Sequence, residues 1–378
     1  MNTLRNLMAA AILAMPAPLM AQTLDEINKL NQMTPEELLP LALAEGTVTV
    51  YSFTSRIGKV EAAFEAAYPG IDMKGFDISS TEQIELLIEE SEDFITNADV
   101  IYISDTPVVL VKIFDGGIIQ PYIPPRIIDR VPPALRDPIL TQRLSTKVLM
   151  YNEEAHPDGP PVDSLWDLTR EEWRGRVFMV DPLKRGDYLD LMTQIFLHAD
   201  EMAAAYEEEF GRPIVLDGVE NAGQQFIADF FANDPVLVDS TDDVNAAVGA
   251  IGQENPPLGF TSYSDRRDNE EEGWALQVAN DVKPSPGIIF PAILAIADKP
   301  NNPAAARLAI DFMMGDETEF GGPGLAPFYV PGDYLSRTDI PQHPDAIPLD
   351  EFNAWLLTAS EAATAVRDEV ADFIVTLR

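Results

Sequence analysis

The sequence predicts an α/β fold of two lobes joined by strands that cross between them. In the first part of the chain, strand-like segments end in loops rich in small hydroxyl residues and alternate with helical segments; they are 47–51, 71–76 and 98–103. This order is typical of an open, mainly parallel sheet. The middle of the chain repeats it, with strand-like segments at 177–180, 236–238 and 258–261. The sequence therefore predicts two open sheets, each flanked by helices.

Two segments have the length and composition to cross between the lobes. We expect the first crossing strand at 144–152 and the second at 274–282, after which 288–297 returns as an apolar strand of the first lobe. Two crossings between two α/β lobes predict a clamshell that closes by hinge motion about these strands.

The expected lobe boundaries follow from these crossings. The first lobe combines 46–145 with 283–378, and the second holds 146–282. Residues 22–45 form a helical leader, because Thr34-Pro35-Glu36-Glu37 has the spacing of a capping box with proline at the first helical position.

The N-terminal segment 1–21 has the features of a secretory signal. Arg5 is its only charge, 7–15 form a short apolar core, and Leu19-Met20-Ala21 is a plausible cleavage site. The apolar run is shorter than the roughly 20 residues that span a bilayer. The alternative, a buried N-terminal helix, is disfavoured by Pro16 and Pro18.

The chain has no cysteine. This excludes a lipid-anchored cysteine, a disulfide and a thiolate metal site or nucleophile. We therefore expect a soluble protein that is exported to the periplasm and is not lipid-anchored.

The charge of the chain limits its partners. Lys and Arg number 25 and Asp and Glu 63, which gives a net charge of −38. Phosphates would be repelled, so we expect no nucleic-acid partner and no anionic-lipid surface. The acidic residues either form a solvated surface or attract a cationic ligand. The content of 46% hydrophobic residues is enough to form globular cores.

Four sets of short motifs occur in order along the chain. They are Val50-Tyr51-Ser52 with Phe64-Glu65 and Tyr68-Pro69-Gly70-Ile71; Ser164-Leu165-Trp166-Asp167-Leu168 with Trp173-Arg174-Gly175-Arg176; Val180-Asp181-Pro182; and Asn302-Pro303-Ala304-Ala305-Ala306-Arg307 with Ile310-Asp311-Phe312-Met313. With these motifs the chain resembles the extracellular (periplasmic) solute-binding proteins of ABC importers, in the group that binds ferric iron, thiamine, sugar phosphates or aminoethylphosphonate. The resemblance implies a type II-like periplasmic binding protein clamshell. It also implies a small-molecule solute and partners that are ABC permease and ATPase subunits. We expect a monomer without a cofactor.

One predicted ligand group is an anion site at a helix start. Lys184 and Arg185 come just before a helix expected to begin near Tyr188. Free backbone N–H groups at a helix start and a nearby cation attract an anion. Phosphate or phosphonate oxygens bind such donors. The alternative is that Lys184 and Arg185 form a solvated turn that pairs with the acidic surface.

Further predicted ligand groups lie in the loops that follow the strands. In the first lobe they are Ser52, Thr54, Ser55, Arg56, Ser79, Ser80, Thr81, Ser104 and Asp105; in the second lobe they are Thr241, Asp242, Tyr263 and Ser264. Asp105, Asp242 and Asp243 would either receive an ammonium group or cap the helices that follow. Basic and acidic loops around one cleft predict a zwitterion such as an amino-phosphonate.

Ferric iron is the alternative ligand. The resemblance implies an adjacent Tyr-Tyr pair for iron, whereas this chain has Ser262-Tyr263-Ser264. We therefore predict no metal site, unless Tyr188 and Tyr263 converge from different loops.

A periplasmic hydrolase is the alternative from another class. Catalysis near neutral pH needs a base, usually histidine, or a cysteine or a metal cluster. His156, His198 and His343 are scattered, and the sequence has no H-x-x-x-H or Gly-x-Ser-x-Gly motif. We therefore predict a binding protein and not an enzyme. Its partner could also be a membrane sensor in place of a transporter.

Overall fold

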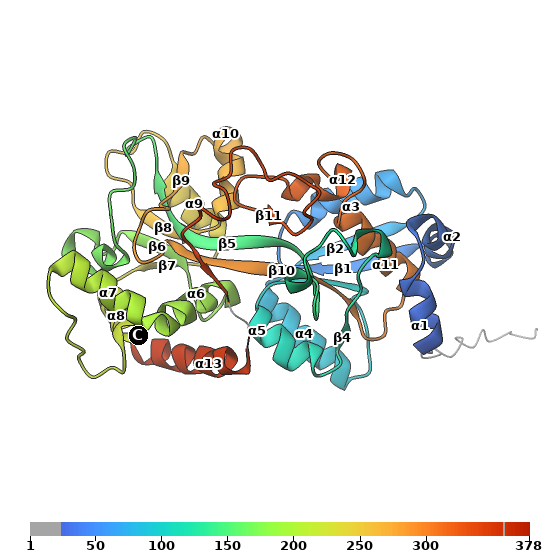
Figure 1. The fold of residues 1–378 in the computed structure, drawn as a ribbon, viewed down its shortest axis with the longest axis horizontal. Helices are drawn as coiled ribbons and strands as arrows, with labels where there is room; N and C mark the ends of the chain where they lie inside the picture. The colour runs from blue at the N-terminus through green and yellow to red at the C-terminus, as the bar shows by residue number, and fades with distance from the viewer. Residues whose placement is uncertain (1–23, 358–359) are drawn as a thin grey trace, which may run out of the picture.

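The computed structural model describes residues 24–357 and 360–378. The signal sequence expected at 1–21 lies outside these residues. Two lobes lie side by side along the long axis, and strands β5 and β10 run between them (Figure 1). The two-lobed α/β fold predicted from the sequence is confirmed.

In the described part of the chain, twelve strands form one sheet. Its main order is β2-β1-β3-β10-β5-β8-β6-β7, and short strands pair with β5 or β10 at the side. The strands are β1 (Thr47–Ser52), β2 (Asp72–Asp77), β3 (Val100–Ile103), β4 (Ile119–Gln120), β5 (Leu140–Asn152), β6 (Val177–Val180), β7 (Val236–Val238), β8 (Leu258–Thr261), β9 (Leu276–Val278), β10 (Gly287–Ala297), β11 (Tyr334–Leu335) and β12 (Trp355–Leu356). The crossing strands join the half-sheets of the two lobes into one continuous sheet.

The crossing strands are β5 and β10. They pair antiparallel from Val148↔Gly287 to Leu140↔Leu294. The predicted first crossing strand, 144–152, lies within β5. The second prediction is wrong: 274–282 contains only the short β9, which pairs with the end of β5, and β10 makes the crossing. The apolar run of β10 is long because the strand is buried through both lobes.

The first lobe is built on β1, which pairs parallel with β2 and β3. Its helices are α1 (Leu24–Asn31), α2 (Pro35–Glu45), α3 (Ile57–Ala67), α4 (Ser80–Glu92), α5 (Thr106–Val108) and α11 (Pro303–Met313). Val48, Val50 and Phe64 are fully buried in its core. Thr34 and Glu37 form the predicted capping box at the start of α2, which packs against α11.

The second lobe is built on β6, which pairs parallel with β7 and β8. Its helices are α6 (Gly186–Leu197), α7 (Ala199–Phe210), α8 (Ala222–Ala232), α9 (Thr241–Gly249) and α10 (Asn269–Glu272). The helix expected to begin near Tyr188 ends at Leu197, and α7 follows it directly, so the two helices meet at His198. The ring of His198 stacks on Trp355 at 4.4 Å, and this tertiary contact accompanies the break.

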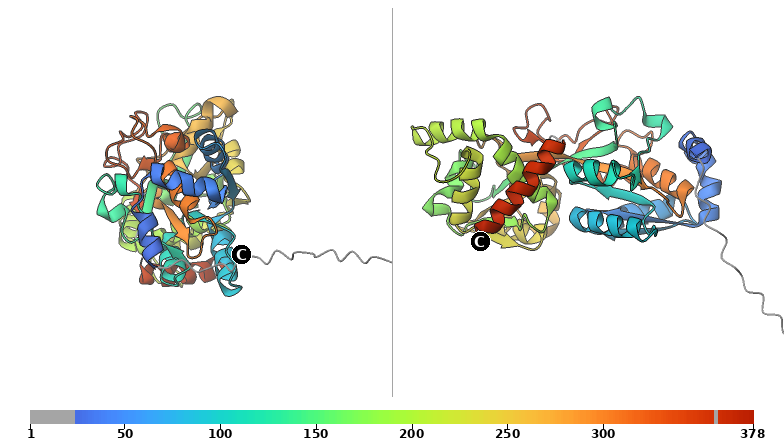
Figure 2. Two further views of the ribbon diagram at one scale, coloured as in Figure 1. Left: turned by 90° about the vertical axis from the view of Figure 1, so that its right-hand side faces the viewer. Right: turned by 90° about the horizontal axis from the view of Figure 1, so that it is seen from below.

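The last part of the chain passes over both lobes. After α12 (Gly322–Leu325), a long segment leads to α13 (Glu361–Thr376), which lies across the junction of the lobes in Figure 2. Val370 and Ile374 of α13 are buried in the core cluster of the second lobe, and α13 packs against α6. Thr364 Oγ1 donates a hydrogen bond to the carbonyl oxygen of Pro107 in the first lobe at 3.1 Å. This helix therefore contacts both lobes.

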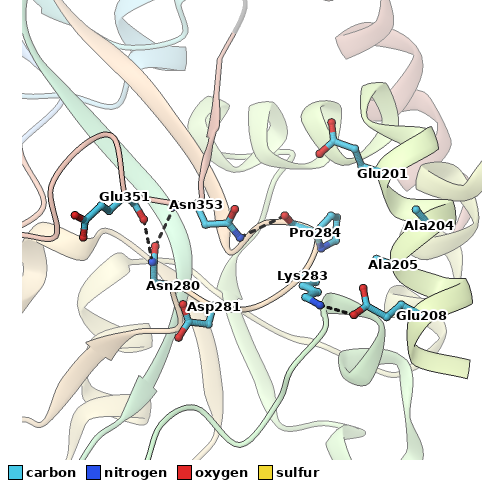
Figure 3. Close-up of a pocket in the computed structure, with 10 residues that line it drawn as sticks. All are labelled: Glu201, Ala204, Ala205, Glu208, Asn280, Asp281, Lys283, Pro284, Glu351 and Asn353. Atoms are coloured by element: carbon cyan, nitrogen blue, oxygen red, sulfur yellow. Dashed lines mark hydrogen bonds and ion pairs between the residues drawn. The ribbon is translucent and has the colours of Figure 1, made fainter.

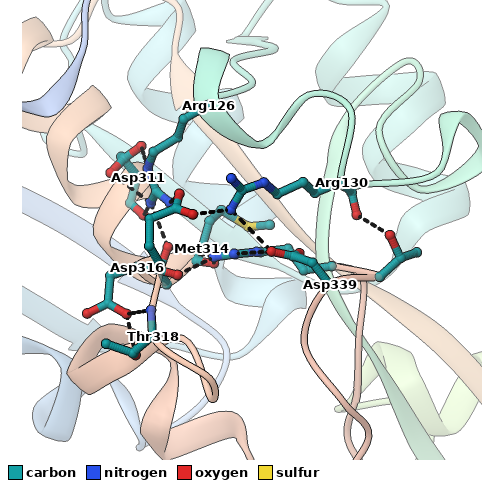
Figure 4. A network of polar contacts seen from close by, with 11 residues as sticks. Arg126, Arg130, Asp311, Met314, Asp316, Thr318 and Asp339 are labelled. Carbon is teal, nitrogen blue, oxygen red and sulfur yellow. Dashed lines mark hydrogen bonds and ion pairs between the residues drawn. The ribbon is translucent and has the colours of Figure 1, made fainter.

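A polar network fixes the turn after α11 (Figure 4). Arg126 donates to both carboxylate oxygens of Asp311 at 2.8 and 2.9 Å and to the carbonyl oxygen of Gly315 at 2.6 Å. Arg337 is buried and donates to the carbonyl oxygens of Gly315 and Asp316 at 2.8 Å each. Cations beside the end of a helix offset its exposed carbonyl groups. The network holds the C-terminal segment against the first lobe.

Candidate functional site

The loops predicted to bind ligand meet where the two lobes touch. Strands β1 and β3 end on the first-lobe side of this boundary, and β6 and β8 end on the second-lobe side. Asp105 follows β3 and lies against Gly186, the first residue of α6: a methyl group at Gly186 would lie 1.6 Å from Oδ2 of Asp105. The predicted site therefore lies at the interlobe boundary, where the two lobes touch each other directly.

The hydroxyl groups of the first lobe form a partly buried cluster. The Oγ atoms of Ser80 and Ser104 are 2.8 Å apart, and the backbone N–H of Ser104 donates to Ser80 Oγ at 3.1 Å. Ser79 caps α4 by accepting a hydrogen bond from the N–H of Glu82 at 3.3 Å, and Thr81 is half-buried. The Ser80–Ser104 pair is thus the buried centre of the predicted group.

The loop after β1 is folded on itself. Ser52 Oγ accepts from the N–H of Thr54 at 3.2 Å and donates to its carbonyl oxygen at 3.0 Å, while Ser55 is exposed. Arg56 is buried, and its Nη1 lies 2.5 Å from Oδ2 of Asp333. The guanidinium expected to face a ligand directly is therefore already paired with a carboxylate.

Asp333 also pairs with a second arginine that sequence reasoning missed. Arg143 Nε lies 3.0 Å from the same Oδ2, and both side chains are fully buried. Burial raises the pKa of Asp333, but the charges of Arg143 and Arg56 outweigh it and hold the pKa below its ordinary value. Burial lowers the pKa of Arg143 to about 9. Its guanidinium lies over the ring of Phe328 at 4.6 Å.

Lys147 joins the crossing strand to the start of α6. Its Nζ lies 3.1 Å from Oδ2 of Asp187, 3.3 Å from Oγ of Ser262 and 4.4 Å from the ring centroid of Tyr188. Arg185 Nη2 lies 3.5 Å from the same oxygen of Asp187. Burial alone would raise the pKa of Asp187, but these two cations lower it overall. Asp187 Oδ1 is buried and has no hydrogen-bond partner among the described residues.

The two basic residues predicted before α6 separate in the structure. Arg185 belongs to the interlobe boundary, whereas Lys184 is exposed and lies 2.6 Å from Asp239, which is also exposed. The position of Lys184 fits the alternative of a solvated turn, and its role as a ligand group stays a prediction. The backbone N–H groups of Lys184 and Arg185 both donate to the carbonyl oxygen of Asp181, so the two residues lie in one turn before α6.

A signal for the missed residues exists in the sequence. Arg143, Ser145 and Lys147 alternate along β5, so their side chains leave the same face of the strand. A polar stripe on a buried crossing strand indicates functional side chains, because buried charges need partners.

The start of α9 is a capped helix end. Ser240 Oγ accepts from the N–H of Asp243 at 3.1 Å and donates to its carboxylate at 2.7 Å. The cap of α9 is therefore Ser240, and neither Asp242 nor Asp243 is the capping residue that the alternative expected. Asp242 is exposed and Thr241 is half-buried, so neither is enclosed by protein at this boundary.

The two candidate tyrosines do not converge. Tyr188 donates its hydroxyl to the carbonyl oxygen of Phe260 at 2.9 Å. Tyr263 donates to the carbonyl oxygen of Asp345 at 3.3 Å and accepts from the N–H of Ile347 at 3.3 Å. Both side chains are fully buried. Their oxygens bind different backbone segments, so this arrangement does not form a phenolate pair.

The loop after β8 carries another buried carboxylate. Asp265 accepts from Thr261 Oγ1 at 3.0 Å and from Arg267 Nη1 at 2.8 Å. Ser264 is fully buried, and its Oγ has no hydrogen-bond partner among the described residues. Ser264 and the free oxygen of Asp187 are polar atoms that a bound molecule can satisfy.

Asp105 is linked to the last helix of the chain. Arg367 of α13 lies 3.2 Å from Oδ2 of Asp105 and 2.8 Å from Oδ1 of Asp190 on α6. Burial raises the pKa of Asp105 to about 6 and that of Asp190 to about 7, although Arg367 opposes both shifts. Sequence reasoning missed Asp190, which lies inside α6, and Arg367, which lies far from the strand-end loops along the chain.

A separate cavity of about 630 Å³ lies on the second lobe (Figure 3). It is lined by Glu201, Ala204, Ala205, Glu208, Asn280, Asp281, Lys283, Pro284, Glu351 and Asn353. None of the predicted ligand groups is among these residues. We place the candidate site at the interlobe boundary, because buried charges and unsatisfied polar atoms gather there.

Among residues 24–357 and 360–378, no group of three or more His, Cys, Asp or Glu side chains is arranged to hold a metal ion. Within the same residues, no helix has the length and apolar character needed to cross a bilayer.

No protein-family sequence model matches the chain, and no curated protein matches it in sequence. Solved structures match it in fold. Iron-bound HitA from Pseudomonas aeruginosa is 18% identical, with 88% of this chain and 99% of that chain covered and a TM-score of 0.66. AfuA from Actinobacillus pleuropneumoniae, solved with fructose-6-phosphate, is 18% identical, with 87% and 99% covered and a TM-score of 0.64. The substrate binding protein of an ABC transporter from Agrobacterium tumefaciens is 14% identical, with 88% and 94% covered and a TM-score of 0.65.

The chain therefore has the two-lobed fold of the periplasmic binding proteins of ABC transporters. These neighbours come from the ferric-iron and sugar-phosphate group that the sequence motifs resemble. Because the sequence identities to these structures are below 20%, the structural similarity establishes the fold alone.

Proposed function

We propose that the chain is the solute-binding component of an ABC importer. It captures a small solute between its lobes in the periplasm and delivers it to a membrane permease driven by ATPase subunits. Its export by the segment 1–21 and its monomeric state are parts of the same proposal, and so are its lobe boundaries, except that α13 packs on the second lobe. The role is binding and not catalysis.

The observation that carries this proposal is the gathering of buried charge at the interlobe boundary. A chain with 63 acidic and only 25 basic residues brings five of the latter to this one place. They are Arg56, Arg143, Lys147, Arg185 and Arg367. Each is paired with an aspartate, and buried pairs of this kind are weak evidence for stability. A role in binding explains why they are placed here.

The paired charges support an anionic or zwitterionic solute of the phosphonate or phosphate type. Arg185 and Lys147 both contact Asp187 at the start of α6 and suit a phosphonate or phosphate group, because the backbone N–H groups of the helix start add to their attraction. Asp105 and the free oxygen of Asp187 suit an ammonium group. The basic and the acidic groups lie at the same boundary, which favours a solute that carries both a negative and a positive charge.

Ferric iron is the alternative ligand, because one similar structure is described as iron-bound. The engaged hydroxyls of Tyr188 and Tyr263 argue against it here. A hydrolase is the alternative from another class. His198 stacks on Trp355 and His343 lies beside Tyr329, so these rings have other partners.

A thermal-shift screen tests the proposal. The panel holds aminoethylphosphonate, fructose 6-phosphate, thiamine, a polyamine and ferric citrate. A ligand that binds only the folded protein raises the unfolding midpoint by mass action. We expect a shift with phosphonate or phosphate compounds. A shift with ferric citrate alone would favour the iron alternative and contradict the proposed ligand class.

A further inference from the structure

The C-terminal helix carries an arginine that contacts both lobes. Val370 and Ile374 anchor α13 in the core cluster of the second lobe. Arg367, on the same helix, lies 2.8 Å from Asp190 of the second lobe and 3.2 Å from Asp105 of the first. The side chains of Arg367, Asp105 and Asp190 are 11%, 1% and 2% exposed. The three groups are therefore enclosed together at the boundary.

Asp105 holds a backbone conformation that needs support from its surroundings. Its φ of 59° and ψ of 41° are left-handed, which is uncommon for a residue other than glycine. This conformation directs the carboxylate across the boundary to Gly186. Arg367 donates to Oδ2 of the same carboxylate at 3.2 Å and compensates its charge.

We propose that Arg367 is a positioning residue of the interlobe site: it holds the carboxylate of Asp105 at the start of α6 and so fastens the two lobes together. The inference deepens the proposed binding function and depends on that function for its role in solute capture. The contact itself is a property of the unliganded chain. An anionic solute that binds at Arg185 must compete with this carboxylate.

The charges around Asp105 make the contact sensitive to pH. One guanidinium faces two buried carboxylates, while Asp187 on α6, Arg185 before α6 and Asp368 beside Arg367 add to the local field. Burial raises the pKa of Asp105 and of Asp190. Opening the lobes returns Asp105 to water, which moves its pKa back toward the ordinary value. The closed arrangement therefore binds protons more tightly, so a rise in pH favours opening.

The distance between the lobes tests the proposal without any ligand. Because the chain has no cysteine, Glu89→Cys on α4 and Glu207→Cys on α7 allow two exposed sites to be spin-labelled. Double electron–electron resonance then measures their separation. We expect Arg367→Gln to shift the distance distribution to longer values. The control is Arg378→Gln, because Arg378 pairs with Asp181 within the second lobe and should leave the distribution unchanged.

Two results would overturn the proposal. One is a distribution in folded Arg367→Gln protein that matches the parent. The other is a parent distribution that already corresponds to separated lobes. Circular dichroism establishes that each variant is folded. Since no solute is used, failure here leaves the proposed binding function intact, and that function is tested separately by the ligand screen.

The pH profile separates positioning from a merely structural role. Between pH 5 and pH 8 the closed-to-open ratio of the parent should fall, by at most about tenfold per pH unit for each proton released. In Asp190→Asn, only Asp105 of the two carboxylates remains to pair with Arg367. The pH profile of this variant should therefore be flatter than that of the parent, and its lobes should stay closed at pH 8. An identical pH profile in the parent and in Asp190→Asn would contradict the proposed role of Arg367.

Discussion

The carboxylate of Asp105 in the first lobe packs directly on Gly186, the first residue of α6 in the second lobe. A methyl group at Gly186 would lie 1.6 Å from Oδ2 of Asp105. Only a residue without a side chain permits this approach at the boundary. The contact brings the two lobes together at the centre of the candidate site, and its consequences can be measured.

The first prediction is that Gly186→Ala separates the lobes. The added Cβ cannot occupy the space of the Asp105 carboxylate, and because that carboxylate is buried and paired with Arg367, we expect the second lobe to move away. Small-angle X-ray scattering should show a larger radius of gyration than for the parent. Gly58→Ala is the matched control, because a Cβ at Gly58 meets nothing within 4 Å. Identical scattering from parent and Gly186→Ala protein would show that the contact does not hold the lobes.

The second prediction concerns the sign of the ligand's charge. Asp105→Asn removes a negative charge that competes with a phosphonate and attracts an ammonium group. The affinity for aminoethylphosphonate relative to ethylphosphonate should fall by about tenfold, which corresponds to about 1.4 kcal/mol. Titration calorimetry with both compounds measures this ratio. An unchanged ratio would mean that Asp105 does not receive the ammonium group.

The third prediction is that Lys147→Met destabilises the fold strongly. The side chains of Lys147 and Asp187 are 2% and 5% exposed, so the variant leaves a buried carboxylate with less compensation. Removing one partner of a buried pair costs about 3–5 kcal/mol in free energy of unfolding. Urea denaturation checks the size of the loss. Lys184→Met, at an exposed pair, should keep the midpoint of the parent, and equal effects of both variants would refute this account.

The fourth prediction is a pH-dependent role for Asp333 in stability. Although burial raises its pKa, Arg143 and Arg56 hold that pKa below the ordinary value. A carboxyl whose folded-state pKa is depressed stabilises the fold above its unfolded pKa of about 3.9 and loses this effect as the pH falls. Asp333→Asn should therefore lower the thermal midpoint at pH 7, and the difference from the parent should shrink toward pH 3. A difference of the same size at both pH values would contradict this role.

Local sequence patterns predicted much of the fold. The strands around β1, β3, β6 and β8 and the capping box at Thr34 follow from residue types that are close in sequence. The second crossing strand was misplaced, because an eleven-residue apolar run fits a strand within one lobe as well as one that spans both. Only the pairing with β5 distinguishes the two.

The candidate site was predicted less completely for a physical reason. Arg185 and Asp105 lie in strand-end loops, where sequence reasoning looks for ligand groups. Asp333 pairs with Arg143, and Arg367 pairs with Asp190, and in each pair the partners are more than 140 residues apart in sequence. Local sequence patterns do not predict such long-range contacts. These partners become visible only when the chain is folded.

The most direct test of the central claim is titration calorimetry of the protein from residue 22 onward with aminoethylphosphonate and fructose 6-phosphate. The same titrations are run on Arg185→Gln, which removes a cation that pairs with Asp187 at the start of α6. The account predicts saturable binding of at least one compound by the parent and a loss of at least tenfold in affinity in the variant. Absence of binding to either compound, or equal affinity in both proteins, would contradict it.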